Sequence, residues 1–223
     1  MKPVIECKPQ KSARFFGLRQ ILALIVALFA APLFAAPSLQ DVAELLAKNK
    51  VTRGQFVLER KASEGGRALR SSGDFTIAAD YGIIWQTKKP VKMTQAVAKD
   101  FAVTESAGGK RTVMDGSQNG VYLQMALLTS ALWTNDLEAA GAAADLNFRS
   151  SENTWTLELF PKEQALKMVL DKIVVSGTCS ESEAVATEMK MQLSGGNSAS
   201  YHMSGQTYDS ALNPSELSFF RTK

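Results

Sequence analysis

Apolar and polar side chains repeat with two different periods along the chain. Residues 38–50 place apolar side chains at helical spacing, and Ser38 followed by Asp41 matches a capping box. From residue 51 the period becomes two, in short runs separated by turn sequences such as Gly108-Gly109. The runs cover 51–61, 68–78, 83–87, 91–97, 101–106 and 111–114. This pattern predicts an antiparallel meander.

The middle of the chain is helical in composition. The very apolar segment 121–133 and the alanine-rich stretch 136–146 predict two helices. Alternation then returns in 148–160, 168–178, 184–193 and 199–208. The order of helix, strands, two apolar helices and strands predicts an α+β fold, mainly antiparallel β. In this fold, helices pack against one face of a curved sheet.

The first 35 residues have the three parts of a secretory signal peptide. Basic residues precede an uncharged run with a strongly apolar centre at 21–29, and small residues follow Pro32. This centre is shorter than the ~20 apolar residues that a transmembrane helix needs. We predict cleavage after Ala35, export to the periplasm and a single domain over 36–223. An uncleaved N-terminal anchor is the alternative.

Charge and cysteine content narrow the function classes. Residues 1–35 hold five of the 25 basic and one of the 22 acidic residues, so the predicted mature chain has 20 basic and 21 acidic residues. This balance lacks the basic footprint of a nucleic-acid-binding protein, so no nucleic acid is expected as a partner. Cys7 lies in the signal segment, which leaves Cys179 as a lone thiol without an internal disulfide. A lone thiol predicts a small buried apolar side chain.

The sequence holds no recognisable catalytic or cofactor motif. It has one histidine, His202, and no G-x-S-x-G elbow, phosphate-binding loop, dinucleotide fingerprint or metal-spaced cluster. We therefore expect no catalytic residue, no metal, no cofactor and no enzymatic activity. An envelope enzyme acting on lipid is an alternative, and it would need a serine or carboxylate beside His202, facing a cavity.

Large apolar side chains on the predicted inner faces either fill an ordinary core or line a cavity. Periodicity alone indicates a core. Two features favour a cavity: the segment 121–133 is more apolar than a helix over a small sheet requires, and methionines supply a flexible, polarizable lining. A curved sheet capped by apolar helices can hold a long apolar ligand.

Two neighbouring predicted strands carry a more specific pattern. Residues 73–77 read Gly-Asp-Phe-Thr-Ile, and residues 82–90 read Gly-Ile-Ile-Trp-Gln-Thr-Lys-Lys-Pro. The G-x-F strand, the short turn and the W-x-T-x-x-P strand resemble the outer-membrane lipoprotein carrier (LolA) family. The run 51–61 is similar to the first strand of that family, which also follows an N-terminal helix. Beyond Pro90 the resemblance rests on the order of elements.

The resemblance implies an incomplete, half-open β-barrel whose concave apolar face is covered by helices. Its cavity would shield acyl chains of lipoproteins or of another lipid between the inner and the outer membrane. The implied partners are an inner-membrane release complex and an outer-membrane acceptor, and a monomer is expected. The ligand-binding residues that we predict are Phe56, Phe75, Ile77, Trp85 and Trp155 on the sheet and Leu123, Leu127 and Trp133 on the helical cover.

One position departs from the family pattern. An ungapped alignment puts Ala79 and Asp80 where the family has a basic residue followed by proline, and that basic residue helps to hold the lid shut. Arg70 or Arg111 is a candidate to replace it. The departure leaves the lid control and the cargo open. An alternative function is a periplasmic sensor or adaptor that uses the same fold to bind a protein, which would require an exposed apolar patch instead of an enclosed cavity.

Overall fold

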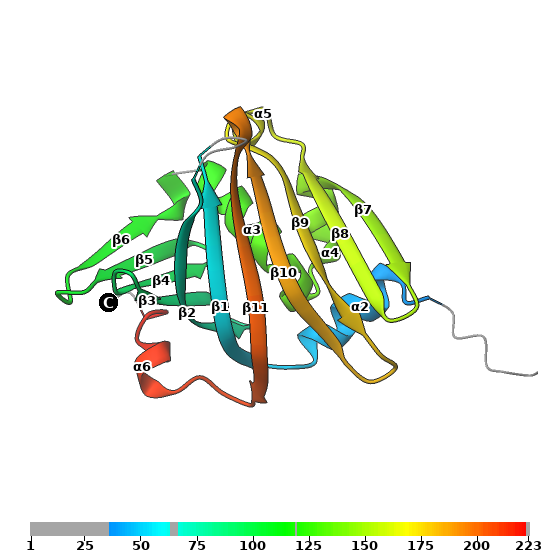
Figure 1. Cartoon of the computed structure of the whole chain (residues 1–223), viewed down its shortest axis with the longest axis horizontal. Helices are drawn as coiled ribbons and strands as arrows, with labels where there is room; N and C mark the ends of the chain where they lie inside the picture. The colour runs from blue at the N-terminus through cyan, green and yellow to red at the C-terminus, as the bar shows by residue number, and fades with distance from the viewer. Residues whose placement is uncertain (1–35, 63–66, 119, 222–223) are drawn as a thin grey trace, which may run out of the picture. The chain divides into compact units, whose positions relative to one another are not determined.

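The fold is built on one antiparallel sheet of 11 strands (Figure 1). The structure is a computed structural model that describes residues 36–62, 67–118 and 120–221, within one compact unit, Ala36–Lys223. The predicted signal peptide and its cleavage site lie outside the described residues. The strands are β1 (Val51–Lys61), β2 (Leu69–Ala78), β3 (Gly82–Lys89), β4 (Met93–Ala98), β5 (Phe101–Ser106), β6 (Arg111–Asp115), β7 (Ala144–Ser151), β8 (Thr154–Pro161), β9 (Leu170–Cys179), β10 (Ala184–Leu193) and β11 (Asn197–Asp209).

The sheet is an incomplete barrel. Neighbouring strands follow the order β6-β5-β4-β3-β2-β1-β11-β10-β9-β8-β7. Strand β1 pairs with both β2 and β11, so it joins the strands that precede the helical segment to those that follow it. Strands β6 and β7 are the two edges of the sheet. The predicted mainly antiparallel, half-open barrel is thereby confirmed.

Helices cover the concave side of this sheet. Helices α3 (Gly120–Thr134) and α4 (Leu137–Ala143) connect β6 to β7, so the chain passes from one edge of the sheet to the other. Figure 1 shows both helices behind the sheet, beside α2 (Leu39–Ala47). The capping box predicted for α2 is confirmed, because Ser38 and Asp41 each accept a hydrogen bond from the other's backbone N–H.

The main core lies between the helices and the sheet, mostly over the second half of the sheet. Trp155 and Leu157 on β8 and Ile173 on β9 are fully buried, and they share one apolar cluster with Leu132 and Trp133 of α3. The buried thiol of Cys179 belongs to the same cluster, as the sequence predicts for a lone cysteine. This half of the molecule is therefore closely packed around α3.

The segment after α3 differs from the prediction. The alanine-rich helix ends at Ala143 and not at Leu146, because Leu146 and Phe148 alternate inward and pair with Leu159 and Leu157 of β8. The predicted strand region 148–160 contains a two-residue turn in which Glu152 has a positive φ of 47°. Two short antiparallel strands, of which β7 is an edge of the sheet, thus replace the end of a helix and one long run.

Four short helical elements were not predicted. They are η1 (Gly116–Gln118), α5 (Gln164–Lys167), η2 (Ser194–Gly196) and α6 (Pro214–Leu217). Helix α6 lies on the convex side of the sheet, where Phe219 packs against Ile84, Ala96 and Val103 in a second small core. Strands β3, β4 and β5 therefore bury apolar side chains on this face as well.

An ion pair fixes α6 to the sheet. Arg53 donates from Nε to Glu216 Oε1 at 2.8 Å and from Nη2 to Oε2 at 2.6 Å. The Thr76 hydroxyl donates to the same carboxylate at 3.0 Å, and the backbone N–H of Asn213 donates at 2.8 Å. Burial by itself raises the pKa of Glu216, but these hydrogen bonds outweigh it and hold the pKa below its ordinary value.

We expect Glu216→Gln to lower the free energy of unfolding by about 2–3 kcal/mol at neutral pH, because it leaves Arg53 without its buried partner. Since the pKa of Glu216 is depressed in the folded state, its contribution is present above the unfolded-state value near 4.3 and is lost as the pH falls through the folded-state value. Urea denaturation of the parent and the variant, at neutral pH and at a pH below the folded-state pKa of Glu216, measures the difference in their free energies of unfolding. A variant as stable as the parent at neutral pH would contradict it.

Candidate functional site: an apolar cavity beneath helix α3

The two halves of the sheet present side chains of different size to the helices. The inward residues of β8 and β9 are large, namely Trp155, Leu157, Leu159, Ile173 and Val175. The inward residues of β4, β5 and β6 are mostly small or polar, namely Gln95, Val97, Ala102, Thr104, Thr112 and Met114. Helix α3 shares one apolar core with the first set, whereas a space remains between α3 and the second set.

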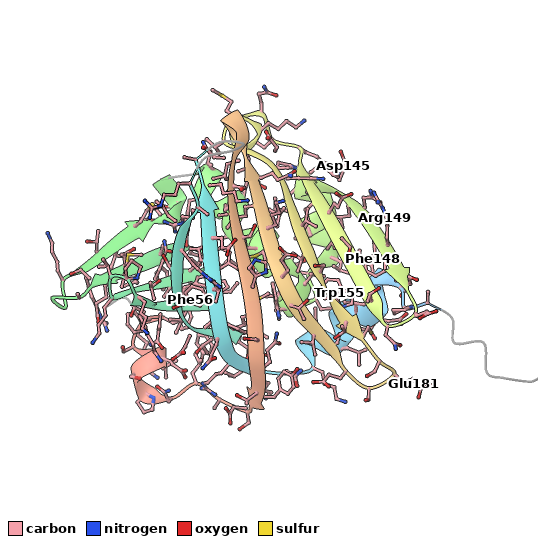
Figure 2. The ribbon with its side chains drawn as sticks, in the orientation of Figure 1. Phe56, Asp145, Phe148, Arg149, Trp155 and Glu181 are labelled. Atoms are coloured by element: carbon pink, nitrogen blue, oxygen red, sulfur yellow. The ribbon has the colours of Figure 1, made fainter. Side chains whose placement is uncertain are left out.

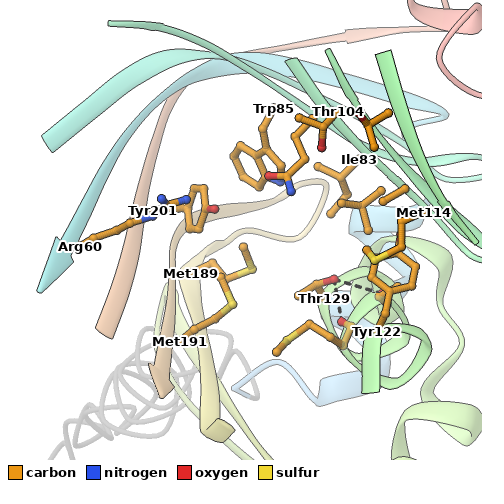
Figure 3. A pocket seen from close by; sticks show the side chains of 16 residues that line it. Arg60, Ile83, Trp85, Thr104, Met114, Tyr122, Thr129, Met189, Met191 and Tyr201 are labelled. Carbon is orange, nitrogen blue, oxygen red and sulfur yellow. Dashed lines mark hydrogen bonds between the residues drawn. The ribbon is translucent and has the colours of Figure 1, made fainter. Parts of the chain in front are cut away.

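This space is a cavity of about 660 Å³ between α3 and strands β3 to β6 (Figure 3). Most of its wall is apolar. The residues that line it are Arg60, Ile83, Trp85, Gln95, Val97, Ala102, Thr104, Thr112, Met114, Tyr122, Met125, Ala126, Thr129, Met189, Met191 and Tyr201. Arg60 is the one charged side chain among them. The cavity can therefore accept a long apolar group whose polar end lies near Arg60.

Trp85 is held in the cavity wall by three other rings. Its ring centroid lies 5.1 Å from that of Phe56 on β1, 5.8 Å from Phe75 on β2 and 4.4 Å from Tyr201 on β11. Aromatic rings in contact prefer tilted and edge-to-face arrangements, and the rings around Trp85 adopt them. The indole is therefore a fixed surface and not a mobile lid.

Glycine is required beside this ring cluster. A Cβ atom on Gly54 would lie 2.7 Å from the Phe75 ring and 2.8 Å from the Ser204 carbonyl oxygen. Gly54 on β1 pairs with Phe75 on β2, and Phe75 pairs with Trp85 on β3. Gly54 thus has a packing reason, because it makes room for the Phe75 ring on the neighbouring strand.

A second cavity of about 360 Å³ adjoins the first along α3. The two share the side chains of Ile83, Val97, Ala126 and Thr129. Carboxylates from Asp80, Asp100 and Asp136 and the amine of Lys99 line the second cavity together with apolar residues. The apolar space beneath α3 is thus continued toward the turn between β2 and β3.

The lid residues of the family pattern are replaced at this turn. Ala79 and Asp80 line the second cavity opposite α3, and neither supplies a positive charge. Arg70 lies near Glu59, with 3.8 Å between Nε and Oε1, and Arg111 pairs with Glu105 and stacks 4.4 Å over the Phe219 ring. Neither arginine lines either cavity.

Tyr122 attaches the first turn of α3 to the sheet. Its hydroxyl donates to the carbonyl oxygen of Phe101 at 2.7 Å, and burial raises its pKa to about 12. Burial also raises the pKa of Tyr201 in the cavity wall, while Arg60 acts in the opposite direction. Both phenols therefore stay neutral at physiological pH, and the lining of the cavity gains no charge from them.

The predicted site residues fall into three places. Trp85 lines the larger cavity, and Leu123 and Leu127 line the smaller one. Phe56 and Phe75 stand behind Trp85 as its ring neighbours. The other three, Ile77, Trp133 and Trp155, are buried in the main core (Figure 2 labels Phe56 and Trp155). Binding of a ligand by these residues stays a prediction.

Most of the cavity wall was missed by the sequence reasoning. Ala102, Thr104 and Thr112 are too small or too polar to stand out as lining residues. The available signal is the contrast between small inward residues on β4 to β6 and large ones on β8 to β9. Of the methionines that the sequence offers for an adaptable lining, Met125, Met189 and Met191 lie in the wall, and Met93 and Met168 do not.

The only histidine does not face the cavity. His202 alternates with Tyr201, which lines the cavity, so its imidazole lies on the other face of β11. There Nδ1 lies 3.8 Å from Glu188 Oε1, and both side chains are substantially exposed. This placement does not meet the requirement of the lipid-enzyme alternative. Among the described residues, no group of three or more His, Cys, Asp or Glu side chains could hold a metal ion.

No helix in the described part of the chain combines the length and the apolar character needed to cross a membrane. The apolar segment 121–133 instead forms most of α3, which is apolar on all sides because one side meets the core and the other meets the cavities.

No protein-family model and no curated protein matches the chain. Solved structures do. A DUF1329 family protein from Desulfovibrio piger is 13% identical, with a TM-score of 0.47 over 82% of this chain and 95% of that chain. A LolA superfamily protein from Nitrosomonas europaea is 10% identical, with a TM-score of 0.45 over 82% and 96%.

A third structure, a domain from Vibrio parahaemolyticus assigned to outer membrane lipoprotein sorting, is 10% identical. Its TM-score is 0.43, over 82% of this chain and all of that chain. These likenesses concern the fold.

Proposed function

We propose that the protein is a periplasmic carrier that shields the acyl chains of lipoproteins, or of a related lipid, during transport from the inner to the outer membrane. The observation that carries the proposal is the mainly apolar cavity of about 660 Å³ beneath α3. Its volume falls in the range of about 300–1,000 Å³ that is usual for small-molecule sites. An inner-membrane release complex and an outer-membrane acceptor are the partners that this role requires.

The hydrophobic effect supplies the driving force for binding. An acyl chain that buries ten methylenes gains on the order of 8 kcal/mol, from which the loss of chain and rigid-body freedom is subtracted. The flexible side chains of Met125, Met189 and Met191 can follow chains of different length and branching. An adaptable wall suits a carrier, because the cargo must also be released.

Brominated fatty acids test where an acyl chain binds, because bromine quenches only those indoles that it contacts. The protein has three tryptophans, and Trp85 lines the cavity while Trp133 and Trp155 belong to the main core. We expect saturable quenching in the parent protein and a much smaller quench in Trp85→Phe. Fluorescence titration measures both, and an unbrominated acid of the same length is the control ligand.

Two outcomes of the fluorescence titration would contradict the proposal. Equal quenching in Trp85→Phe would place the acyl chain outside this cavity, and no binding of any fatty acid would remove the carrier proposal. Native mass spectrometry of protein recovered from its own periplasm, followed by lipid extraction, then identifies the class of cargo. Binding of a protein but no lipid would favour the adaptor alternative.

A further inference from the structure

One end of the sheet gathers exposed apolar side chains. Consecutive strand ends lie side by side there: Leu69 of β2 pairs with Arg60 of β1, and Lys61 of β1 pairs with Ser198 of β11. Ser198 pairs with β10, which reaches β9 through the pair Leu193 and Leu170. We call this row of strand ends, from Leu69 to α5, the rim.

The rim carries the two most exposed large apolar side chains of the described residues. Met168 is 72% exposed and Leu69 is 69% exposed, and Val169 beside Met168 is 45% exposed. The backbone N–H of Ser194 donates to Val169 O at 3.2 Å, so α5 is fastened to the turn between β10 and β11 (top of Figure 1). Four strand spacings separate Leu69 from β9, which is about 19 Å.

Cations flank these apolar side chains. Arg67 precedes Leu69, Lys167 precedes Met168, and Lys61 ends β1, and all three are exposed without an ion-pair partner among the residues that the structure describes. Of the nearby carboxylates, Glu59 lies 3.8 Å from Arg70 and Asp171 accepts from the Ser194 hydroxyl, while Glu163 is unpaired in the same part of the chain. The cations at the rim are therefore mostly free to meet an external anionic surface.

The far ends of the same strands carry several carboxylates. Glu181 and Glu183 lie in the turn between β9 and β10, Asp80 follows β2, and Asp209, which ends β11, is paired with Arg53. Figure 2 shows Glu181 at the end of the sheet remote from α5. Strands β9 and β10 have ten residues each, a length of about 33 Å. This exceeds the Debye length of about 8 Å at physiological ionic strength, so the acidic end does not cancel the attraction of the rim.

The larger cavity extends to the rim. Arg60, which lines it, is the partner of Leu69 in the β1–β2 ladder and lies one residue from Lys61. An acyl chain that leaves the cavity past Arg60 would emerge beside Leu69. The apolar side chains at the rim are therefore placed to continue the apolar path from the cavity wall into a lipid layer.

We propose that the rim docks the protein on an anionic phospholipid bilayer, with Leu69, Met168 and Val169 in the interfacial region and Lys61, Arg67 and Lys167 on the head groups. Apolar side chains beside long cationic ones are the combination that interfacial binding uses, since the cations keep their charge at the head-group level. This docking is a property separate from the identity of the cargo. It orients the cavity toward the membrane.

Vesicle flotation of the ligand-free protein tests the docking. We expect binding to phosphatidylglycerol-containing vesicles that weakens with salt, and little binding to phosphatidylcholine vesicles. The double change Lys61→Ala and Lys167→Ala should weaken partitioning by about 25-fold, at about fivefold for each cation near an anionic surface. Leu69→Ser with Met168→Ser should weaken it at least about tenfold, because their apolar contact with the interface is lost.

Val113→Ser is the matched control, because Val113 is 54% exposed on β6, away from the rim. It should leave partitioning unchanged, and an equal loss in this control would overturn the proposal. Absence of vesicle binding would also overturn the proposal. Binding of the rim to an acidic protein, with no binding to any vesicle, would overturn it in the same way. The rim variants should keep the brominated-fatty-acid quench of the parent, which separates a failure of docking from a failure of the carrier function.

Discussion

Gly73→Ala is expected to lower the free energy of unfolding by at least about 3 kcal/mol, or to prevent folding. A Cβ atom at Gly73 would lie 1.9 Å from the carbonyl oxygen of Gln86, 2.8 Å from its carbonyl carbon and 2.9 Å from the Cα atom of Thr87. All three are backbone atoms, so no side chain can turn aside. The register between β2 and β3 shifts at Ser72 and Gly73, which brings the two backbones together.

Urea denaturation of purified protein measures this effect, and circular dichroism shows whether the variant folds. Gly108→Ala is the matched control, because nothing lies within 4 Å of a Cβ atom at Gly108. The control should change stability by less than about 0.5 kcal/mol. If Gly73→Ala were as stable as Gly108→Ala, the close approach of β2 and β3 at this point would be wrong.

The strands were predictable where local patterning and the fold agree. The alternation in 51–61, 101–106 and 184–193 matches β1, β5 and β10 residue for residue. The G-x-F and W-x-T-x-x-P motifs also have a physical reason, since Phe75 and Trp85 are cross-strand partners in one ring cluster. Turn glycines and alternating side chains act over a few residues, so a single sequence is enough to recognise them.

Features that depend on distant partners were not predictable. Helix α6 is held by Arg53, which is 163 residues from Glu216, and a four-residue helix has little propensity of its own. The turn at Glu152 lacks glycine and adopts a positive φ that its sequence does not signal. Helix α6 thus depends on a partner that is distant in sequence, whereas the Glu152 turn closes the local hairpin of β7 and β8 without the usual turn glycine.

Most residues that line the cavity could not be predicted from the sequence either. Large apolar residues are visible in a sequence, and they drew the prediction toward Phe56, Trp133 and Trp155, which the structure places behind the wall or in the main core. A cavity arises where side chains are small, as at Ala102 and Thr104. Small residues cannot be assigned to a wall until the topology brings α3 across them. The site therefore follows from the contrast between the two halves of one sheet.

The contrast between the two halves of the sheet also predicts that filling the cavity will strongly weaken acyl-chain binding. Thr129 lies on the side of α3 that faces both cavities, and its hydroxyl donates to the carbonyl oxygens of Met125 at 2.9 Å and Ala126 at 3.1 Å (Figure 3). Thr129→Phe should place a ring in the apolar space. Displacing three methylenes costs about 2.4 kcal/mol, so affinity for hexadecanoic acid should fall by about 50-fold.

Octanoic acid should lose much less affinity than hexadecanoic acid, because a short chain can occupy the cavity beside the new ring. Thr129→Val is the matched control: it keeps the size of the side chain and removes only hydroxyl bonds to the helix's own backbone, so both affinities should stay close to those of the parent. Calorimetric titration of the two acids measures the ratio. An equal loss for both chain lengths would indicate a displaced helix instead of a filled cavity, and no loss for either would place the acyl chain elsewhere.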